Sequence, residues 1–282
     1  MKTWHKRIVL ACLLVYSMQI MAGCATNHPQ VNIEGMATAR QYDAEGIYVR
    51  HLRLRLAPSH TKAFEAMMKR CVEAARNSRE RAEPLEWLCY RESPGRYWII
   101  QFSDALDGFQ TQSGLRGFAL DVARAESAEA EGEVWRMLID LEYETEWEIV
   151  TRQKSDWSTV TSMATATHPK ARMMMRMIRP GLEEAFETAL AARTGFFRDH
   201  DYPLPVEGFA TRSGAPGLEM QVVFPVDWPS FHETDSFYAF VKSLDQETQD
   251  VYAGLKASLM ETMSGAEYYD GDFVAELSHS GI

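Results

Sequence analysis

The sequence lacks the short motifs that mark several large classes of enzyme. No G-x-S-x-G, P-loop or G-x-G-x-x-G occurs, so serine-hydrolase, nucleotide-binding and dinucleotide-binding functions have no motif to support them. No helical H-x-x-x-H pair and no C-x-x-C occurs either, and we therefore predict no metal centre. The chemistry of this chain cannot be inferred from any single motif.

Clusters of basic residues are also absent. The 282-residue chain has a formal net charge of −11, with 40 acidic and 29 basic residues. Binding to a nucleic acid needs lysine and arginine gathered against the phosphates, so we expect no nucleic-acid partner. Apolar residues make up 46% of the chain, which is enough to form packed cores.

Long apolar runs are missing except near the start of the chain. The run from Ile8 to Ile20 follows a basic segment, residues 2–7. It spans about 13 residues, whereas a membrane-spanning helix needs about 20. A basic segment, an apolar run and small residues form the layout of a secretory signal.

The residues after this run, Met21-Ala22-Gly23-Cys24, resemble the lipobox of bacterial lipoproteins. That resemblance implies a signal peptide over residues 1–23, acylation of Cys24 and a lipidated tether over residues 24–46. Because Ala25 follows the cysteine, it implies anchoring in the outer membrane, facing the periplasm. An uncleaved anchor helix and an ordinary signal with an incidental cysteine are the alternatives.

Cysteine is scarce as well. Of four cysteines, Cys12 would leave with the signal and Cys24 would carry lipid, so only Cys71 and Cys89 remain. In a compartment that permits disulfides, these two form either one structural disulfide or two buried thiols. The sequence leaves both arrangements open.

The chain repeats itself at an offset of 122 residues. Over a window of about 61 residues, chance would give roughly three identities at ordinary composition. At least nine occur without a gap, and most are residues that mark cores and turns: Pro58/Pro180, Ala63/Ala185, Phe64/Phe186, Glu65/Glu187, Pro94/Pro216, Gly95/Gly217, Phe102/Phe224, Phe109/Phe231 and Phe118/Phe240. A period this long indicates two tandem repeats.

Each copy predicts the same order of elements, βαββαβ, which is the ferredoxin-like plan. Alternation and helical spacing place the first copy's elements at 48–56, 64–75, 85–92, 97–102, 134–141 and 146–151, and the second copy's at 172–178, 182–197, a hairpin closed at 215–217, 238–263 and 267–275. We therefore expect one repeat over residues 47–152, a linker over 153–168 and a second repeat over 169–282.

The strand ends Leu56-Ala57-Pro58 and Ile178-Arg179-Pro180-Gly181, each followed by a helix with Ala-Phe-Glu, resemble the dimeric α+β barrel superfamily. Antibiotic-biosynthesis monooxygenases and NIPSNAP-type domains belong to it. The resemblance implies two sheets face to face with a ligand pocket between them. The predicted fold class is thus α+β, with two tandem ferredoxin-like repeats that form an intrachain barrel.

Strand alternation predicts which side chains line this pocket. We expect the helices to cover Leu52, Leu54 and Leu56, with Trp98, Ile100 and Phe102 of the same repeat and Met220, Val222 and Phe224 of the other. The opposite face supplies the candidate ligand-binding residues: His51, Arg53, Arg55, Tyr97, Gln101, Met175, Glu219 and Gln221. The two arginines would favour an anionic ligand. The alternative is a polar, solvated sheet face.

Three functions from different classes remain. The first is a membrane-anchored lipoprotein that binds a small amphipathic or anionic ligand. The second is an enzyme, monooxygenase-like or haem-handling, with His51, Tyr97 and Trp98 as the nearest candidates and haem as the cofactor left open. The third is a non-catalytic protein that meets other envelope proteins. An open pocket would favour the first two, and a space filled by side chains would favour the third.

Overall fold

The computed structural model describes residues 47–78, 86–103, 109, 114–159, 168–214 and 217–279. All of them belong to one compact unit of the chain that begins at Ala37. The predicted signal, Cys24, the tether and residues 160–167 of the predicted linker lie outside the described residues. Within the described residues, no helix is both long and apolar enough to cross a membrane.

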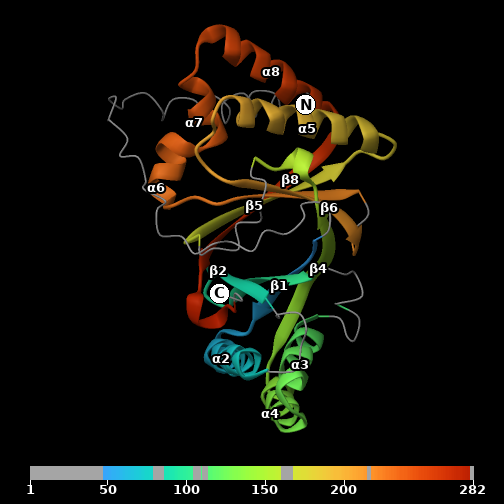
Figure 1. Cartoon of the computed structure of the whole chain (residues 1–282), viewed down its shortest axis with the longest axis vertical. Coiled ribbons are helices and arrows are strands. Elements are labelled where there is room, and N and C mark those ends of the chain that lie inside the picture. Colours follow the sequence, from blue (N-terminus) through green and yellow to red (C-terminus); the bar gives the residue numbers. More distant parts are fainter. Residues whose placement is uncertain are drawn as a thin grey trace, which may run out of the picture. The chain divides into compact units, whose positions relative to one another are not determined.

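Two βαββαβ halves follow one another along the chain, as the repeat predicts (Figure 1). The strands of the first half are β1 (Tyr48–Leu56), β2 (Glu86–Ser93), β3 (Arg96–Ser103) and β4 (Tyr143–Gln153), and its α-helices are α2 (Thr61–Asn77), α3 (Gly114–Glu126) and α4 (Ala128–Ile139). The second half has β5 (Lys170–Ile178), β6 (Val206–Ser213), β7 (Leu218–Val223), β8 (Met263–Phe273), α5 (Glu183–Asp199), α6 (Trp228–Ser230), α7 (Phe237–Lys242) and α8 (Gln246–Glu261).

Each half has a second helical region, between its hairpin and its last strand. The sequence predicts a single helix there, whereas the structure has several shorter helices. In the first half, α4 starts after Ser127, whose side chain accepts a hydrogen bond from the amide of Ala130. In the second half, Asp227, Ser236 and Asp245 cap the successive helices α6, α7 and α8 in the same way. A π-helical turn, η4 (Phe231–Asp235), lies between α6 and α7. Each cap satisfies the free amides of a helix start, which favours a break at that point.

The eight strands close into an antiparallel barrel in the order β1-β3-β2-β8-β5-β7-β6-β4. Each half contributes four neighbouring strands, with its first and third strands adjacent to each other. The halves join where β4 pairs with β6 and where β2 pairs with β8. This confirms the mixed α+β fold and the barrel within one chain.

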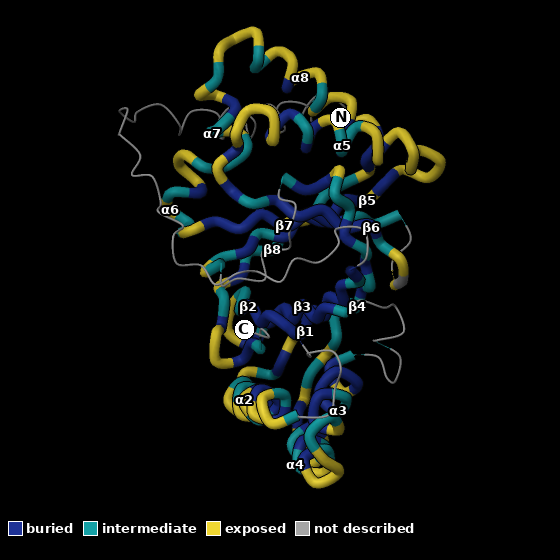
Figure 2. The backbone as a smooth tube through the Cα atoms, viewed as in Figure 1, coloured by how far each residue is buried: buried dark blue, intermediate teal, exposed yellow. Residues whose placement is uncertain are grey.

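Helices cover the outer face of each half's sheet (Figure 1). In the first half, α2, α3 and α4 pack on the outer side chains of β1, β2 and β3, including Leu52, Trp87 and Ile99. In the second half, α5, α7 and α8 cover outer residues such as Met174 and Val223. The strands are largely buried while the helices expose one side, as Figure 2 shows.

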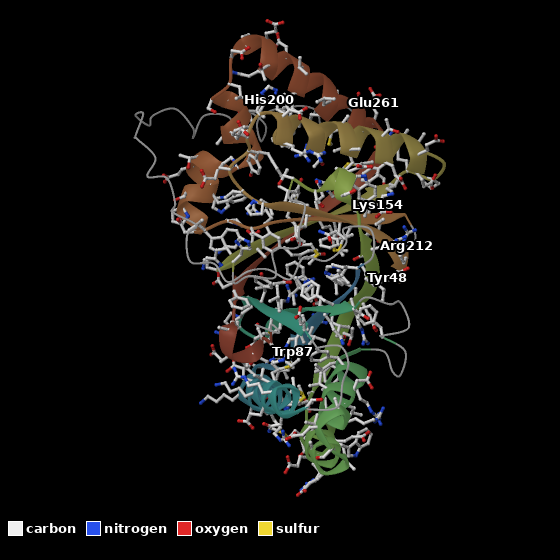
Figure 3. All side chains as sticks on the ribbon, viewed as in Figure 1. Tyr48, Trp87, Lys154, His200, Arg212 and Glu261 are labelled. Carbon is white, nitrogen blue, oxygen red and sulfur yellow. The ribbon has the colours of Figure 1, made fainter. Side chains whose placement is uncertain are left out.

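The inner faces of both halves form one shared apolar cluster. Its members come from seven of the strands and their ends: Ile47, Val49, Leu88, Tyr90, Trp98, Ile100, Phe102, Ile149, Ala171, Met173, Met175, Phe209, Met220, Val222 and Phe224. Side chains of both halves meet in this region (Figure 3). The inside of the barrel is therefore mostly occupied by apolar side chains.

The predicted faces are correct for β1 and β5 but wrong for β3 and β7. Ile99 lies opposite Leu52 and Tyr97 opposite Leu54, so these two β3 residues face the helices, and Trp98, Ile100 and Phe102 face inward. Likewise Met220, Val222 and Phe224 face inward. Both strands are buried on their two faces, and a strand without polar alternation carries no signal for which face is inner.

The two cysteines are buried free thiols between helices and sheet, the second of the two arrangements left open. Cys71 lies on α2 with its sulfur 3.9 Å from the carbonyl oxygen of Ala119, and Cys89 lies on β2. Burial raises the pKa of the Cys71 thiol to about 12 and that of Cys89 further still. Neither is a reactive thiolate at neutral pH.

Candidate functional site inside the barrel

Three ring-bearing side chains meet inside the barrel on adjacent strands. His51 of β1, Trp98 of β3 and Tyr90 of β2 are each fully buried. The ring of Trp98 lies between the other two, with centroids 6.0 Å from His51 and 5.4 Å from Tyr90. Phe209 of β6 meets the His51 ring edge-on at 5.4 Å, so both halves of the chain form this aromatic cluster.

The hydrogen bonds around His51 fit one tautomer of the neutral ring. The Thr151 hydroxyl donates to the carbonyl oxygen of Val49 at 3.2 Å, so it accepts from Nε2 of His51, 3.1 Å away. Nδ1 is then an unprotonated acceptor, and it has no partner among the described residues. Burial lowers the pKa of His51 to about 3, which keeps the imidazole neutral.

The other two rings of the cluster each present an unused donor. The phenol of Tyr90 and the indole Nε1 of Trp98 have no hydrogen-bond partner in the described part of the chain. Burial raises the pKa of Tyr90, and the nearby carboxylate of Glu207 raises it further, so the phenol keeps its proton. The cluster therefore offers one acceptor and two donors inside an apolar wall.

Charged residues gather at one end of the barrel. Arg53 points inward there, but its guanidinium is 2.8 Å from the carboxylate of Glu92 and 2.7 Å from that of Glu146, and it lies 4.0 Å from the ring of Tyr269. Arg55 is half exposed and paired with Glu144. Both arginines are already neutralised, which removes the charge that motivated an anionic ligand in the interior.

A cleft of about 340 Å³ opens beside this end, on the outside of the barrel. Its walls are formed by the end of β1 and the start of β4, namely Arg55, Leu56, Ala57, Glu142, Tyr143 and Glu144. Because two glutamates accompany the single arginine, the cleft has no positive charge to hold an anion.

The predicted site residues are divided between the two faces of the sheet. His51, Arg53 and Met175 lie on the inner face. Tyr97 and Gln101 lie on the outer face of β3, with Tyr97 donating to Glu65 of α2 at 2.6 Å. The structure therefore separates Tyr97 from His51 and Trp98, and the enzymatic trio does not form.

The second-half candidates also turn toward the helices. Gln221 donates to the carbonyl oxygen of Trp157 at 2.9 Å and to Thr194 at 3.1 Å. Glu219 accepts a hydrogen bond from the amide of Thr211 at 2.8 Å, and burial raises its pKa to about 7. Sequence analysis missed Tyr90, whose pairing with Trp98 across β2 and β3 would identify it once the register is known.

A haem does not fit at His51. Iron ligation needs an imidazole nitrogen that opens onto a space large enough for a macrocycle. Here the ring is fully buried, stacked against Trp98 and bounded by Phe209. Among the described residues there is also no group of three or more histidine, cysteine or carboxylate side chains that could hold a metal ion.

Comparisons with known proteins add likenesses of fold. No protein-family model matches the chain, and no curated protein matches its sequence. Solved structures do resemble it, and the three described next have TM-scores below 0.5. An anthrone oxidase-like protein is 9% identical with a TM-score of 0.49, covering 82% of this chain and 92% of that one.

Two further solved structures have similar values. A heme-binding protein from Thermus thermophilus is 10% identical with a TM-score of 0.44, covering 86% of this chain and 96% of that one. A variant chlorite dismutase from Candidatus Nitrospira defluvii is 9% identical with a TM-score of 0.47, covering 82% and 92%. At these sequence identities and TM-scores, the structural similarities assign neither a family nor an activity to this chain.

Proposed function

We propose that this protein binds a small, neutral, amphipathic molecule inside its barrel, beside His51, Tyr90 and Trp98. The observation that carries the proposal is the set of three fully buried polar atoms on neighbouring strands without partners in the described residues. Leaving a buried polar atom unsatisfied costs about 1–3 kcal/mol. A bound molecule that supplied one donor and two acceptors would offset that cost.

The chemistry of the wall defines the class of ligand. The inner cluster is apolar and rich in aromatic rings and methionine, which suits a flat or aromatic body. Arg53 is neutralised by Glu92 and Glu146, so a negative charge on the ligand would find no counter-ion there. A ring that bears a hydroxyl or amide group matches both features.

The location of the protein is a second part of the proposal. Met21-Ala22-Gly23-Cys24 supports attachment through lipid on Cys24 to the outer membrane, facing the periplasm. Two or more acyl chains would make such attachment stable.

Phenol binding tests the interior site. We expect the purified full chain to bind phenol more tightly than toluene, in a titration followed by tryptophan fluorescence. Tyr90→Phe should weaken phenol binding about tenfold, because it removes one hydrogen bond worth about 1 kcal/mol or slightly more. Native mass spectrometry of the same preparation would show whether a small molecule co-purifies.

The matched control is Tyr97→Phe. Tyr97 is also a buried tyrosine, but its hydroxyl donates to Glu65 on the helix side of the sheet. This variant should lose stability and keep phenol affinity. The proposal fails if phenol binds no better than toluene, or if both variants weaken binding equally.

The second candidate is a non-catalytic envelope protein that contacts other proteins. The observation that favours it is that apolar side chains of both halves occupy most of the barrel, which is the arrangement expected from the sequence for this class of protein. In that case Tyr90→Phe should raise the unfolding midpoint by removing an unsatisfied hydroxyl, and no small molecule should bind. For the enzymatic alternative, the only supporting observation among the described residues is the contact between the rings of His51 and Trp98.

A further inference from the structure

Two arginines are buried on the helix side of the second half. Arg176 lies on β5 and is 5% exposed, and Arg193 lies on α5 and is 7% exposed. They lie close enough for the charge of Arg193, after burial itself, to lower the pKa of Arg176 to about 9. Buried guanidinium groups in folded proteins are nearly always paired with an acidic group.

Among the described residues, neither arginine has an acidic partner. Nη1 of Arg176 has no hydrogen-bond partner, and Nη2 lies 3.8 Å from the sulfur of Met174. Arg193 is held by long bonds to neutral groups, 3.4 Å to the Tyr252 hydroxyl and 3.4 Å to Oε1 of Gln221. Two like charges thus lie close together with no acidic counter-charge among the described residues.

The carboxylate that lies opposite Arg176 in the sheet makes its contacts elsewhere. Glu219 of β7 lies directly opposite Arg176 in the strand register. Its side chain instead accepts from the amide of Thr211 and lies near Glu187, Arg212 and Lys154. Glu219 therefore does not compensate the charge of either arginine.

The first half shows that the fold does not need these charges. At the repeat offset of 122, Arg176 corresponds to Leu54 and Arg193 to Cys71. Both first-half residues are fully buried members of the core between sheet and helices. The second half therefore has a cation at each of two positions that its counterpart fills with small or apolar side chains.

We propose that Arg176 and Arg193 form a binding site for a small oxyanion, a carboxylate or a phosphate, between β5 and the helices α5, α7 and α8. Guanidinium groups match the paired oxygens of both anions. The guanidinium of Arg193 lies over the rings of Phe237, Phe197 and Tyr252, at 4.5, 5.1 and 6.0 Å from their centroids, and the Tyr252 hydroxyl is a further polar group. This site lies on the opposite face of the sheet from the aromatic cluster, because Met173 and Met175 of β5 face the interior.

Thermal unfolding of the full chain tests the anion site. We compare sodium phosphate and sodium acetate with sodium chloride at equal ionic strength. One of the two oxyanions should raise the melting temperature saturably, by about 5 °C or more at 100 times its Kd, and chloride should not. A response to phosphate alone assigns a phosphate ligand, and a response to acetate alone a carboxylate. Equal melting temperatures at every concentration of the three salts would overturn the proposal.

Arginine variants then test whether the oxyanion that raises the melting temperature binds at this site. Arg176→Leu installs the first-half residue, so it should raise the melting temperature in chloride and abolish the oxyanion effect. Arg198→Leu, at an exposed position of α5, should keep the effect. If Arg176→Leu fails to fold, Arg176→Lys should fold and reduce the oxyanion shift.

Two outcomes would contradict the site. Retention of the full oxyanion response in Arg176→Leu would place the anion elsewhere. Retention of the full response in Arg176→Lys would do the same where Arg176→Leu does not fold. Phenol binding, which reports on the barrel interior, should be unchanged in every arginine variant, so the two proposals can fail separately.

Discussion

At the scale of single residues, the burial of His51 makes folding sensitive to acid. Its pKa is lowered from 6.5 to about 3 in the folded chain, so between these values the unfolded state binds a proton that the folded state does not. The sign follows directly: the stability that comes from keeping this imidazole neutral is fully present above pH 6.5 and is lost as the pH falls toward 3. His168, with a pKa lowered to about 4, acts in the same direction.

We therefore predict that His51→Gln flattens the pH dependence of stability. Between pH 6.5 and 4.5 the variant should lose about 2 kcal/mol less free energy of unfolding than the parent chain, because glutamine has no proton to gain. Urea unfolding at several pH values measures this. His200→Gln, at an exposed position, is the control and should follow the parent chain. An unchanged slope in His51→Gln would show that the imidazole is accessible to protons.

Residue-scale prediction from sequence succeeded where strand alternation was clear. In β1, the leucines and the polar residues separate onto two faces, and this correctly placed His51 and Arg53 inside. Tyr97 was misplaced because its strand reads Tyr-Trp-Ile-Ile, with large apolar groups on both faces. The pairing of Arg53 with Glu92 and Glu146 was also beyond sequence reasoning, since it depends on the register of three strands.

At the scale of elements, one close approach fixes how β6 meets the segment after β4. This segment forms the 3-10 turn η3 (Ser155–Trp157), and a Cβ on Gly208 of β6 would lie 2.1 Å from the Cβ of Trp157. Two hydrogen bonds, from the Lys154 amide to the Gly208 carbonyl oxygen and from the Gly208 amide to the Ser158 hydroxyl, hold the two segments at this distance.

Gly208→Ala should therefore destabilise the protein. The methyl group must push η3 away from β6, and overpacking of this kind costs about 1–3 kcal/mol. The urea midpoint measures the loss. Gly132→Ala is the control, since nothing lies within 4 Å of that position on α4, and it should stabilise the helix by about 0.5–1 kcal/mol. A neutral Gly208→Ala would mean that η3 moves freely.

Most elements were predictable because the same order of strands and helices can be recognised in both copies of the repeat. The strand bounds agree to within a few residues, as in β1 over Tyr48–Leu56. The breaks at Ser127, Ser236 and Asp245 were missed, although each is a common N-cap residue. Helical periodicity continues across such caps, so a pattern search joins the neighbouring helices.

At the scale of the whole molecule, the end of the second half completes the core of the first. After β8, the 3-10 turn η5 (Ala275–Leu277) lies against α2 and β2, and Leu277 is fully buried in the first half's core. The indole of Trp87 donates to the carbonyl oxygen of Leu277 at 2.8 Å, and His279 pairs with Trp87 through two backbone bonds. Trp87 is labelled in Figure 3 beside this segment.

Leu277→Ala should thus weaken both halves together. The cavity should cost about 2–5 kcal/mol, and unfolding should remain a single transition because the halves share strand pairs and an inner core. Ile139→Ala, at a residue that is 62% exposed, should change stability by about 0.5 kcal/mol or less. Two separate transitions, or equal effects of both variants, would contradict this view of one cooperative unit. Tryptophan fluorescence during denaturation is the measurement.

The pairing of β2 with β8 also has a consequence for how the chain is synthesised. β2 is complete by Ser93, whereas its outer neighbour begins at Met263, so about 170 residues must be made before that neighbour exists. During this interval the nascent first half presents an uncovered strand edge, the kind of surface on which chains aggregate. Nascent chains would therefore depend on chaperones until the last strand is made.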